Sequence, residues 1–215
     1  MLTFIQQILT MLATGSGIYV AINGLNSWKR ETIGKRDIEL CQKVIELFYE
    51  AEHRLEILRS PLSYAEEGNS RPKPERESEH DQDRRNVLYV PLARFHAQSE
   101  FWSEFFSYKF RMRAIFGENA VEAFNSVDEA LRAFRAAALT RYQALANNPN
   151  SLNHETTRKF EEIIWSGSTN PDELDQKMKR GISMMEEICV PIVRASRDGN
   201  TGGIFRKFRK IRYFQ

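Results

Sequence analysis

Residues 1–28 of the chain read MLTFIQQILTMLATGSGIYVAINGLNSW and contain no charged side chain. Four basic residues follow closely, namely Lys29, Arg30, Lys35 and Arg36. A bilayer core is about 30 Å thick, and a helix of roughly 20 mainly apolar residues crosses it. The pattern therefore predicts a transmembrane anchor over residues 1–26, with the lipid bilayer as its first partner.

The position of the basic residues predicts the orientation of this anchor. Lys and Arg close to the end of a span favour the cytosol, and none precedes the span. A secretory signal peptide fits less well, because no basic residue precedes the apolar run and no clear small-x-small cleavage site precedes the charges. We expect a protein of the bacterial inner membrane with its N-terminus outside and its body in the cytoplasm.

Small and uncharged polar residues of the anchor recur every three or four positions, which places them on one helical face. Small residues let two helix backbones approach closely, and polar ones can form hydrogen bonds across the contact. Residues 10–24 therefore either associate with a second copy or another membrane protein, or belong to an anchor without a partner. The residues expected at such a contact are Thr10, Ala13, Thr14, Gly17 and Ala21.

The body after the anchor is predicted to be all-α. Its apolar residues recur at helical spacing, and no alternating pattern of useful length appears. We expect a long amphipathic helix over residues 27–60, within an antiparallel bundle of about four to five helices. The predicted buried lines are Cys41, Val44, Phe48, Ala51, Leu55 and Leu58; Val127, Leu131, Phe134, Ala138, Tyr142 and Leu145; and Leu174, Met178, Ile182, Met185, Cys189 and Ile192.

Residues 61–86 differ in composition from their surroundings. They contain Pro72, Pro74 and many charges of both signs, with almost no apolar residue. Such a stretch buries too little apolar surface to offset the entropy lost on ordering. We therefore expect a disordered charged loop over residues 61–86, followed by the helical bundle over residues 87–196.

The aromatic residues concentrate in a predicted helix over residues 91–116 that Gly117 ends. Their number exceeds one helical stripe, which predicts a helix covered on more than one side. They are expected to form core, and a ligand groove is the second interpretation. Further helix starts are predicted at the capping box of Ser126 and Glu129 and at Asn170-Pro171.

No catalytic motif of recognisable spacing appears in the chain. Glu-x-x-His occurs as Glu50/His53 and Glu77/His80, a spacing that holds di-iron sites on bundle helices. The first pair is expected to point away from the buried line, however, and the second lies in the predicted loop. We expect no catalytic residue, no metal site and no cofactor, and the two distant cysteines to be free buried thiols in a reducing compartment.

The chain ends in a basic, aromatic tail, residues 197–215. From Arg194 onward seven basic residues face a single acidic one, Asp198, although the whole chain carries a net charge of only +2. Such a cluster favours anionic lipid; a solvated tail and, less readily, a nucleic-acid contact are the alternatives. The residues expected to contact lipid are Phe205, Arg206, Lys207, Phe208, Arg209, Lys210 and Arg212.

The stretch GLNSWKRE at residues 24–31, with Gly34-Lys35, Phe48-Tyr49 and Arg59-Ser60-Pro61, resembles an uncharacterised bacterial family of short proteins with an N-terminal membrane anchor and a helical cytosolic body. The resemblance covers about the first 60 residues. It implies the same topology and transfers no functional residue.

Three functions are compatible with these patterns. The first is a single-pass membrane protein whose helical body acts by interaction, as a scaffold or accessory subunit. The second is a soluble helical protein whose first segment packs on a partner. The third is an enzyme with a site among the aromatic helices, which would require polar groups converging on a pocket there.

Overall fold

The computed structural model describes residues 34–64, 66–75 and 77–197. The predicted anchor and most of the basic tail lie outside these residues. The described residues are helical with no strand, which confirms the all-α class. No helix among them has the length and apolar character that a membrane crossing requires.

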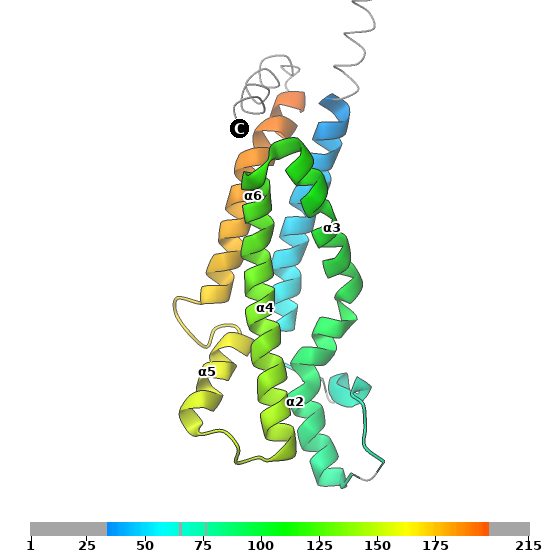
Figure 1. Cartoon of the computed structure of the whole chain (residues 1–215), viewed down its shortest axis with the longest axis vertical. Coiled ribbons are helices and arrows are strands. Elements are labelled where there is room, and N and C mark those ends of the chain that lie inside the picture. Colours follow the sequence, from blue (N-terminus) through cyan, green and yellow to red (C-terminus); the bar gives the residue numbers. More distant parts are fainter. Residues whose placement is uncertain (1–33, 65, 76, 198–215) are drawn as a thin grey trace, which may run out of the picture. The chain divides into compact units, whose positions relative to one another are not determined.

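Helices follow one another along the chain with short connections (Figure 1). A long helix covers residues 34–58, and a single 3-10 turn, η1, follows it. The remaining elements are η1 (Glu67–Ser70), α2 (Glu79–Ala97), α3 (Ser99–Phe116), α4 (Glu118–Asn147), α5 (His154–Ile164) and α6 (Glu173–Arg197).

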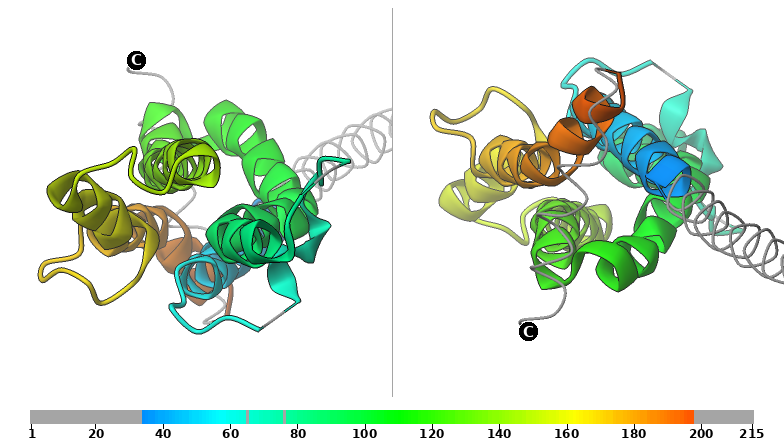
Figure 2. Two further views of the ribbon diagram at one scale, coloured as in Figure 1. Left: turned by 90° about the horizontal axis from the view of Figure 1, so that it is seen from below. Right: turned by 90° about the horizontal axis from the view of Figure 1, so that it is seen from above.

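The described residues fall into two compact units. The smaller one holds residues 34–42 and 192–197, and the larger one holds residues 43–191. Cys41, Ile192 and Ala195 are buried in the smaller unit. In the larger unit, residues 43–58, α3, α4 and the part of α6 up to Pro191 surround a common axis (Figure 2), which agrees with the predicted helical bundle.

An aromatic cluster forms the centre of the larger unit. The Phe48 ring lies 4.9 Å from the Phe105 ring and 5.0 Å from the Phe124 ring, and all three side chains are fully buried. All the residues predicted to be buried on the first and last helices are buried. Of the residues predicted to be buried on α4, those from Val127 to Ala138 are buried. Burial of such rings contributes strongly to stability, at about 1.5–3 kcal/mol for each large apolar side chain.

Small residues bring α4 and α6 close together. A Cβ atom at Gly181 would lie 2.8 Å from the carbonyl oxygen of Ala123, which leaves room for glycine alone. The hydroxyl of Ser126 donates a hydrogen bond to the carbonyl of Lys177 at 2.7 Å. Ser126 therefore joins two helices instead of starting one: the predicted helix start at this residue is wrong, and α4 runs unbroken from Glu118 to Asn147.

The expectation of a disordered loop over residues 61–86 does not hold in the structure. Residues 67–70 form η1, and α2 begins at Glu79 with Ser78 as its N-cap. Arg71 is buried; its guanidinium donates to Asn86 at 2.7 Å and also contacts Glu77. Some of the charges that predicted disorder thus form ion pairs with one another, namely Arg71 and Arg85 with Glu77, and Arg84 with Asp81. The paired groups satisfy the hydrogen bonds that water would otherwise make.

The aromatic segment is two helices instead of one. It divides at Gln98, where the backbone turns and the Gln98 side chain donates to the carbonyl of Arg54 at 3.4 Å. Pro91, which was expected to open the helix, lies inside α2. A proline inside a helix removes one backbone hydrogen bond, but α2 continues past it for six residues.

The start of α6 is held by the buried side chain of Arg59. Its guanidinium donates to Asp172 at 2.7 and 2.9 Å and to Asp175 at 2.8 Å. It also donates to the carbonyls of Glu162, Ile163 and Trp165 at the end of α5. Asp172 in turn accepts from the backbone N–H of Leu174, so Asp172, not Asn170, caps this helix.

Candidate functional site

A groove of about 460 Å³ opens on the surface of the larger unit between α3 and α4, with the end of α2 at one side. Aromatic and aliphatic side chains dominate its lining, and its charged groups all come from α4. The lining residues are Phe95, Trp102, Ser103, Phe106, Ser107, Phe110, Asp128, Leu131, Arg132 and Arg135.

The spacing of α3 places different aromatic residues on its two sides. Phe101 and Phe105 face the core, where Phe105 packs on Phe48. Trp102, Phe106 and Phe110 follow one another at intervals of four residues and line the groove. The inner side of α3 is therefore core, as expected, and its outer side borders a surface groove, whose use by a ligand stays a prediction.

The floor of the groove rests on the packed core. The Phe106 ring stands edge-on to the Phe105 ring, with 5.0 Å between centroids and 88° between planes. The Trp102 ring lies 6.0 Å from the same Phe105 ring at 77°. Edge-to-face pairs of this kind are favourable arrangements for aromatic rings, and they fix the positions of the rings that line the groove.

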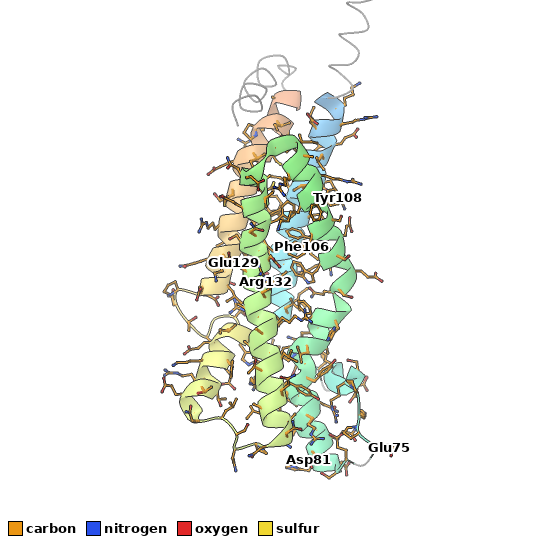
Figure 3. All side chains as sticks on the ribbon, viewed as in Figure 1. Glu75, Asp81, Phe106, Tyr108, Glu129 and Arg132 are labelled. Atoms are coloured by element: carbon orange, nitrogen blue, oxygen red, sulfur yellow. The ribbon has the colours of Figure 1, made fainter. Side chains whose placement is uncertain are left out.

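Two arginines of α4 lie along the groove. Arg132 forms an ion pair with Asp128, one helical turn before it, at 2.7 Å. Arg135 instead lies over the ring of Phe95, with 5.6 Å from the guanidinium carbon to the ring centroid. Figure 3 shows Phe106 of α3 and Arg132 of α4 between these two helices. The groove thus combines an apolar floor with cationic groups on its α4 side.

The remaining polar groups of the groove offer little for catalysis. The Ser107 hydroxyl donates to the carbonyl of Glu104 at 2.7 Å, within its own helix. The indole N–H of Trp102 is buried and has no hydrogen-bond partner in the described part of the chain. Asp128 is already paired with Arg132.

A second hollow, of about 430 Å³, lies between the start of α2 and the end of α4. Its basic lining residue Arg84 donates to the carbonyls of Leu145 and Ala146. Arg85 donates to the carbonyl of Ala146 at 2.9 Å. The last carbonyls of a helix lack partners within the helix, so these two arginines have a structural role, to complete α4.

The two Glu-x-x-His motifs differ in their surroundings. Glu50 and His53 are exposed, as expected. The Glu77 carboxylate contacts Arg71 and lies 2.8 Å from Arg85, and these hydrogen bonds, that of Arg71 first, hold its pKa below the ordinary value. His80, His96 and His154 are exposed. Over the residues described, no group of three or more His, Cys, Asp or Glu side chains could hold a metal ion.

The residues predicted to contact lipid, in the tail, and those predicted for helix association, in the anchor, lie outside the described residues. Of the groove residues of α4, the sequence analysis named only Leu131, as a residue expected to be buried, and not the three charged ones. Asp128, Arg132 and Arg135 follow one another at intervals of four and three residues, which places them on one helical face. The sequence shows this spacing, but it does not show that α3 packs beside this face of α4 and forms the groove with it.

Comparison with known proteins adds no relative. No protein-family model, curated protein or solved structure matches this chain. The site is therefore interpreted from its own geometry: the fold defines an all-helical protein with an aromatic and arginine-bearing surface groove.

Proposed function

We propose that this chain is a single-pass inner-membrane protein whose cytoplasmic helical body acts by binding another protein, as a scaffold or accessory subunit. The observation that carries the proposal is the chargeless stretch of residues 1–28, followed by Lys29, Arg30, Lys35 and Arg36. Such a segment is favoured in hydrocarbon, and a basic flank stays on the cytosolic side. The resemblance of residues 24–61 to anchored bacterial proteins supports the same topology.

The body supports an interaction role. Its centre is filled by the Phe48, Phe105 and Phe124 rings, while the groove between α3 and α4 remains open at the surface. Exposed aromatic side chains next to arginine are typical of protein-binding sites, in which these residue types are enriched. The helix-association face at residues 10–24 offers a second contact, within the membrane, for a copy of the chain or for another membrane protein.

The basic tail is proposed to bind anionic lipid at the cytoplasmic surface. Its five basic residues from Arg206 to Arg212 alternate with Phe205, Phe208 and Ile211. Each basic residue close to an anionic surface contributes about 1 kcal/mol. An anchored chain would hold this tail near that surface, which favours lipid over nucleic acid as the partner.

Cell fractionation with a C-terminal reporter tests insertion and orientation together. The expected result is a chain that sediments with membranes, resists carbonate extraction and carries its reporter in the cytoplasm. An intact chain that stays in the supernatant would rule out the anchor. The alternative of a soluble partner-binding protein predicts that outcome, and also predicts aggregation once residues 1–26 are deleted.

A further inference from the structure

Phe110 and Arg135 lie toward opposite ends of the groove between α3 and α4. Lys109 of α3 contacts Asn125 of α4 at 2.6 Å, and Phe95, at the end of α2 just before α3 begins, lies under Arg135 further along α4. The segment from Phe95 to Lys109 therefore runs antiparallel to α4 along the groove. Phe110 lies toward one end and is 72% exposed. Arg135 marks the other end and makes no ion pair with any described residue.

The dimensions of the groove match a short helix. Trp102 and Phe110 are eight residues apart on α3, a distance of about 12 Å at 1.5 Å per residue. The small side chains of Ser103 and Ser107 line the groove together with the rings of Trp102, Phe106 and Phe110. A helix that places apolar residues at intervals of three and four along one face can pack on such a row of rings.

The charged residues of the groove favour an occupant that carries a negative charge. Arg132 already has a carboxylate partner in Asp128. A neutral helix over the groove would remove water from Arg135 without replacing it, which is unfavourable for a charged group. A carboxylate at the same place would form a charge-assisted hydrogen bond with the guanidinium.

We propose that this groove binds one amphipathic α-helix of a partner protein, which carries an Asp or Glu about two turns away from its apolar anchor residues. The carboxylate contacts Arg135, and the apolar residues cover Phe106 and Phe110. The inference rests on the proposed interaction function and specifies the chemistry of the partner.

Other occupants fit the groove less well. A second copy that presents the same groove offers Arg135 only one carboxylate, that of Asp128, which already forms an ion pair with Arg132. The chain's own tail is basic and would be repelled by Arg135, and residues 1–28 carry no carboxylate. A fatty acid would leave much of its chain in water, because the groove is open along its length.

Selection from a library tests the proposal without knowledge of the natural partner. The full chain, in lipid nanodiscs, selects from displayed 18-residue amphipathic helices whose polar positions vary among Glu, Lys and Gln. We expect enriched helices to share a Glu six to eight positions from an apolar pair. An enriched peptide with a fluorescent label then gives the Kd by anisotropy.

Matched variants connect the binding to the groove. Arg135→Glu and Phe110→Ser should each weaken the enriched peptide by at least about tenfold, equivalent to about 1.4 kcal/mol. Arg180→Glu, the same charge change on an exposed residue of α6, should leave the Kd unchanged. A peptide with Lys in place of the shared Glu should bind Arg135→Glu better than the original chain, which a misfolded variant could not do.

Each opposite result overturns the proposal. These results are no enrichment, enrichment of basic helices, an unchanged Kd for Arg135→Glu, oleate binding in place of peptide, or a dimer that Phe110→Ser dissociates. Carbonate extraction of the same preparations separates the two hypotheses. An inserted chain that selects no helix refutes the groove inference alone, and a chain that binds the peptide but never inserts refutes the anchor alone.

Discussion

Among the residues that the structure describes, Arg59 is the largest whose side chain is completely buried. It is surrounded by the Asp172 carboxylate, which is also mostly buried, by Asp175, and by three carbonyls at the end of α5. Replacement by methionine keeps much of the volume but removes every donor. We expect Arg59→Met to lower the free energy of unfolding by about 3–5 kcal/mol, because a buried carboxylate is left without its cation.

Urea unfolding followed by circular dichroism measures this loss. Arg158→Met is the matched control, because Arg158 pairs with Glu162 across one turn of α5 and is 63% exposed. Exposed pairs of this kind contribute about 0.3–0.5 kcal/mol. If the two variants lost equal stability, Arg59 would not be the residue that fastens α5 and α6 to the end of the first helix.

The same cluster determines how the protein responds to acid. Burial alone would raise the pKa of Asp172, but hydrogen bonds from Arg59 and from the N–H groups of Asp175 and Leu174 outweigh it and hold the pKa below the ordinary 3.8. The pKa of Glu77 is likewise held below its ordinary 4.5, first by the hydrogen bond from Arg71. At acid pH the unfolded chain therefore binds more protons than the folded one at these two positions.

We therefore expect these two carboxylates to stabilise the fold at neutral pH, and the free energy of unfolding to fall as the pH drops through about 4.5 and below. Asp172→Asn should flatten this acid limb while lowering stability at pH 7. Urea midpoints at successive pH values from 7 to 3 measure the effect. An acid limb unchanged by Asp172→Asn would show that other carboxylates account for it.

At the scale of elements, η1 depends on one glycine for its contact with α2. A Cβ atom at Gly68 would lie 2.0 Å from the carbonyl oxygen of Asn86, so η1 and the α2 backbone would have to separate. Overpacking of this kind costs about 1–3 kcal/mol. We expect Gly68→Ala to loosen residues 61–78 locally, seen as faster hydrogen exchange there with little change in α4. Ser70→Ala, at an exposed position of the same turn, should leave exchange as it was.

The spacing of apolar residues predicted those helices whose stability comes from burial of one face. The predicted burial of the residues spaced from Val44 to Leu58 and from Leu174 to Cys189 was correct, because these residues share one helical face that packs on the core. The order in residues 61–86 was missed for a physical reason. Its stability comes from ion pairs between residues distant in sequence, such as Arg94 with Glu67 at 2.7 Å, and composition does not show which charges meet.

The groove was only partly predictable for the same reason. The aromatic residues of α3 were visible in the sequence, but they were expected to form core on more than one side of the helix, with a ligand groove as the second interpretation. The break at Gln98 and the unbroken course of α4 past Ser126 decide which aromatic residues face outward. Both depend on contacts with other helices, Gln98 with the carbonyl of Arg54 and Ser126 with that of Lys177, and neither contact has a local sequence signal.

For the whole molecule, we expect substitutions in the proposed anchor to affect membrane insertion, and substitutions in the groove to leave insertion unchanged. Leu9→Arg places a charge near the middle of the predicted span, which costs about 2.5–3.5 kcal/mol for insertion. We expect the carbonate-resistant fraction to fall sharply. Gly24→Arg adds the same charge beside the basic flank and should insert normally. Phe110→Ser, in the groove, should not change the membrane fraction at all. If Leu9→Arg also left the carbonate-resistant fraction unchanged, the first segment would pack on a partner protein and would not insert into lipid. The groove would then belong to a soluble partner-binding protein, the second function considered above.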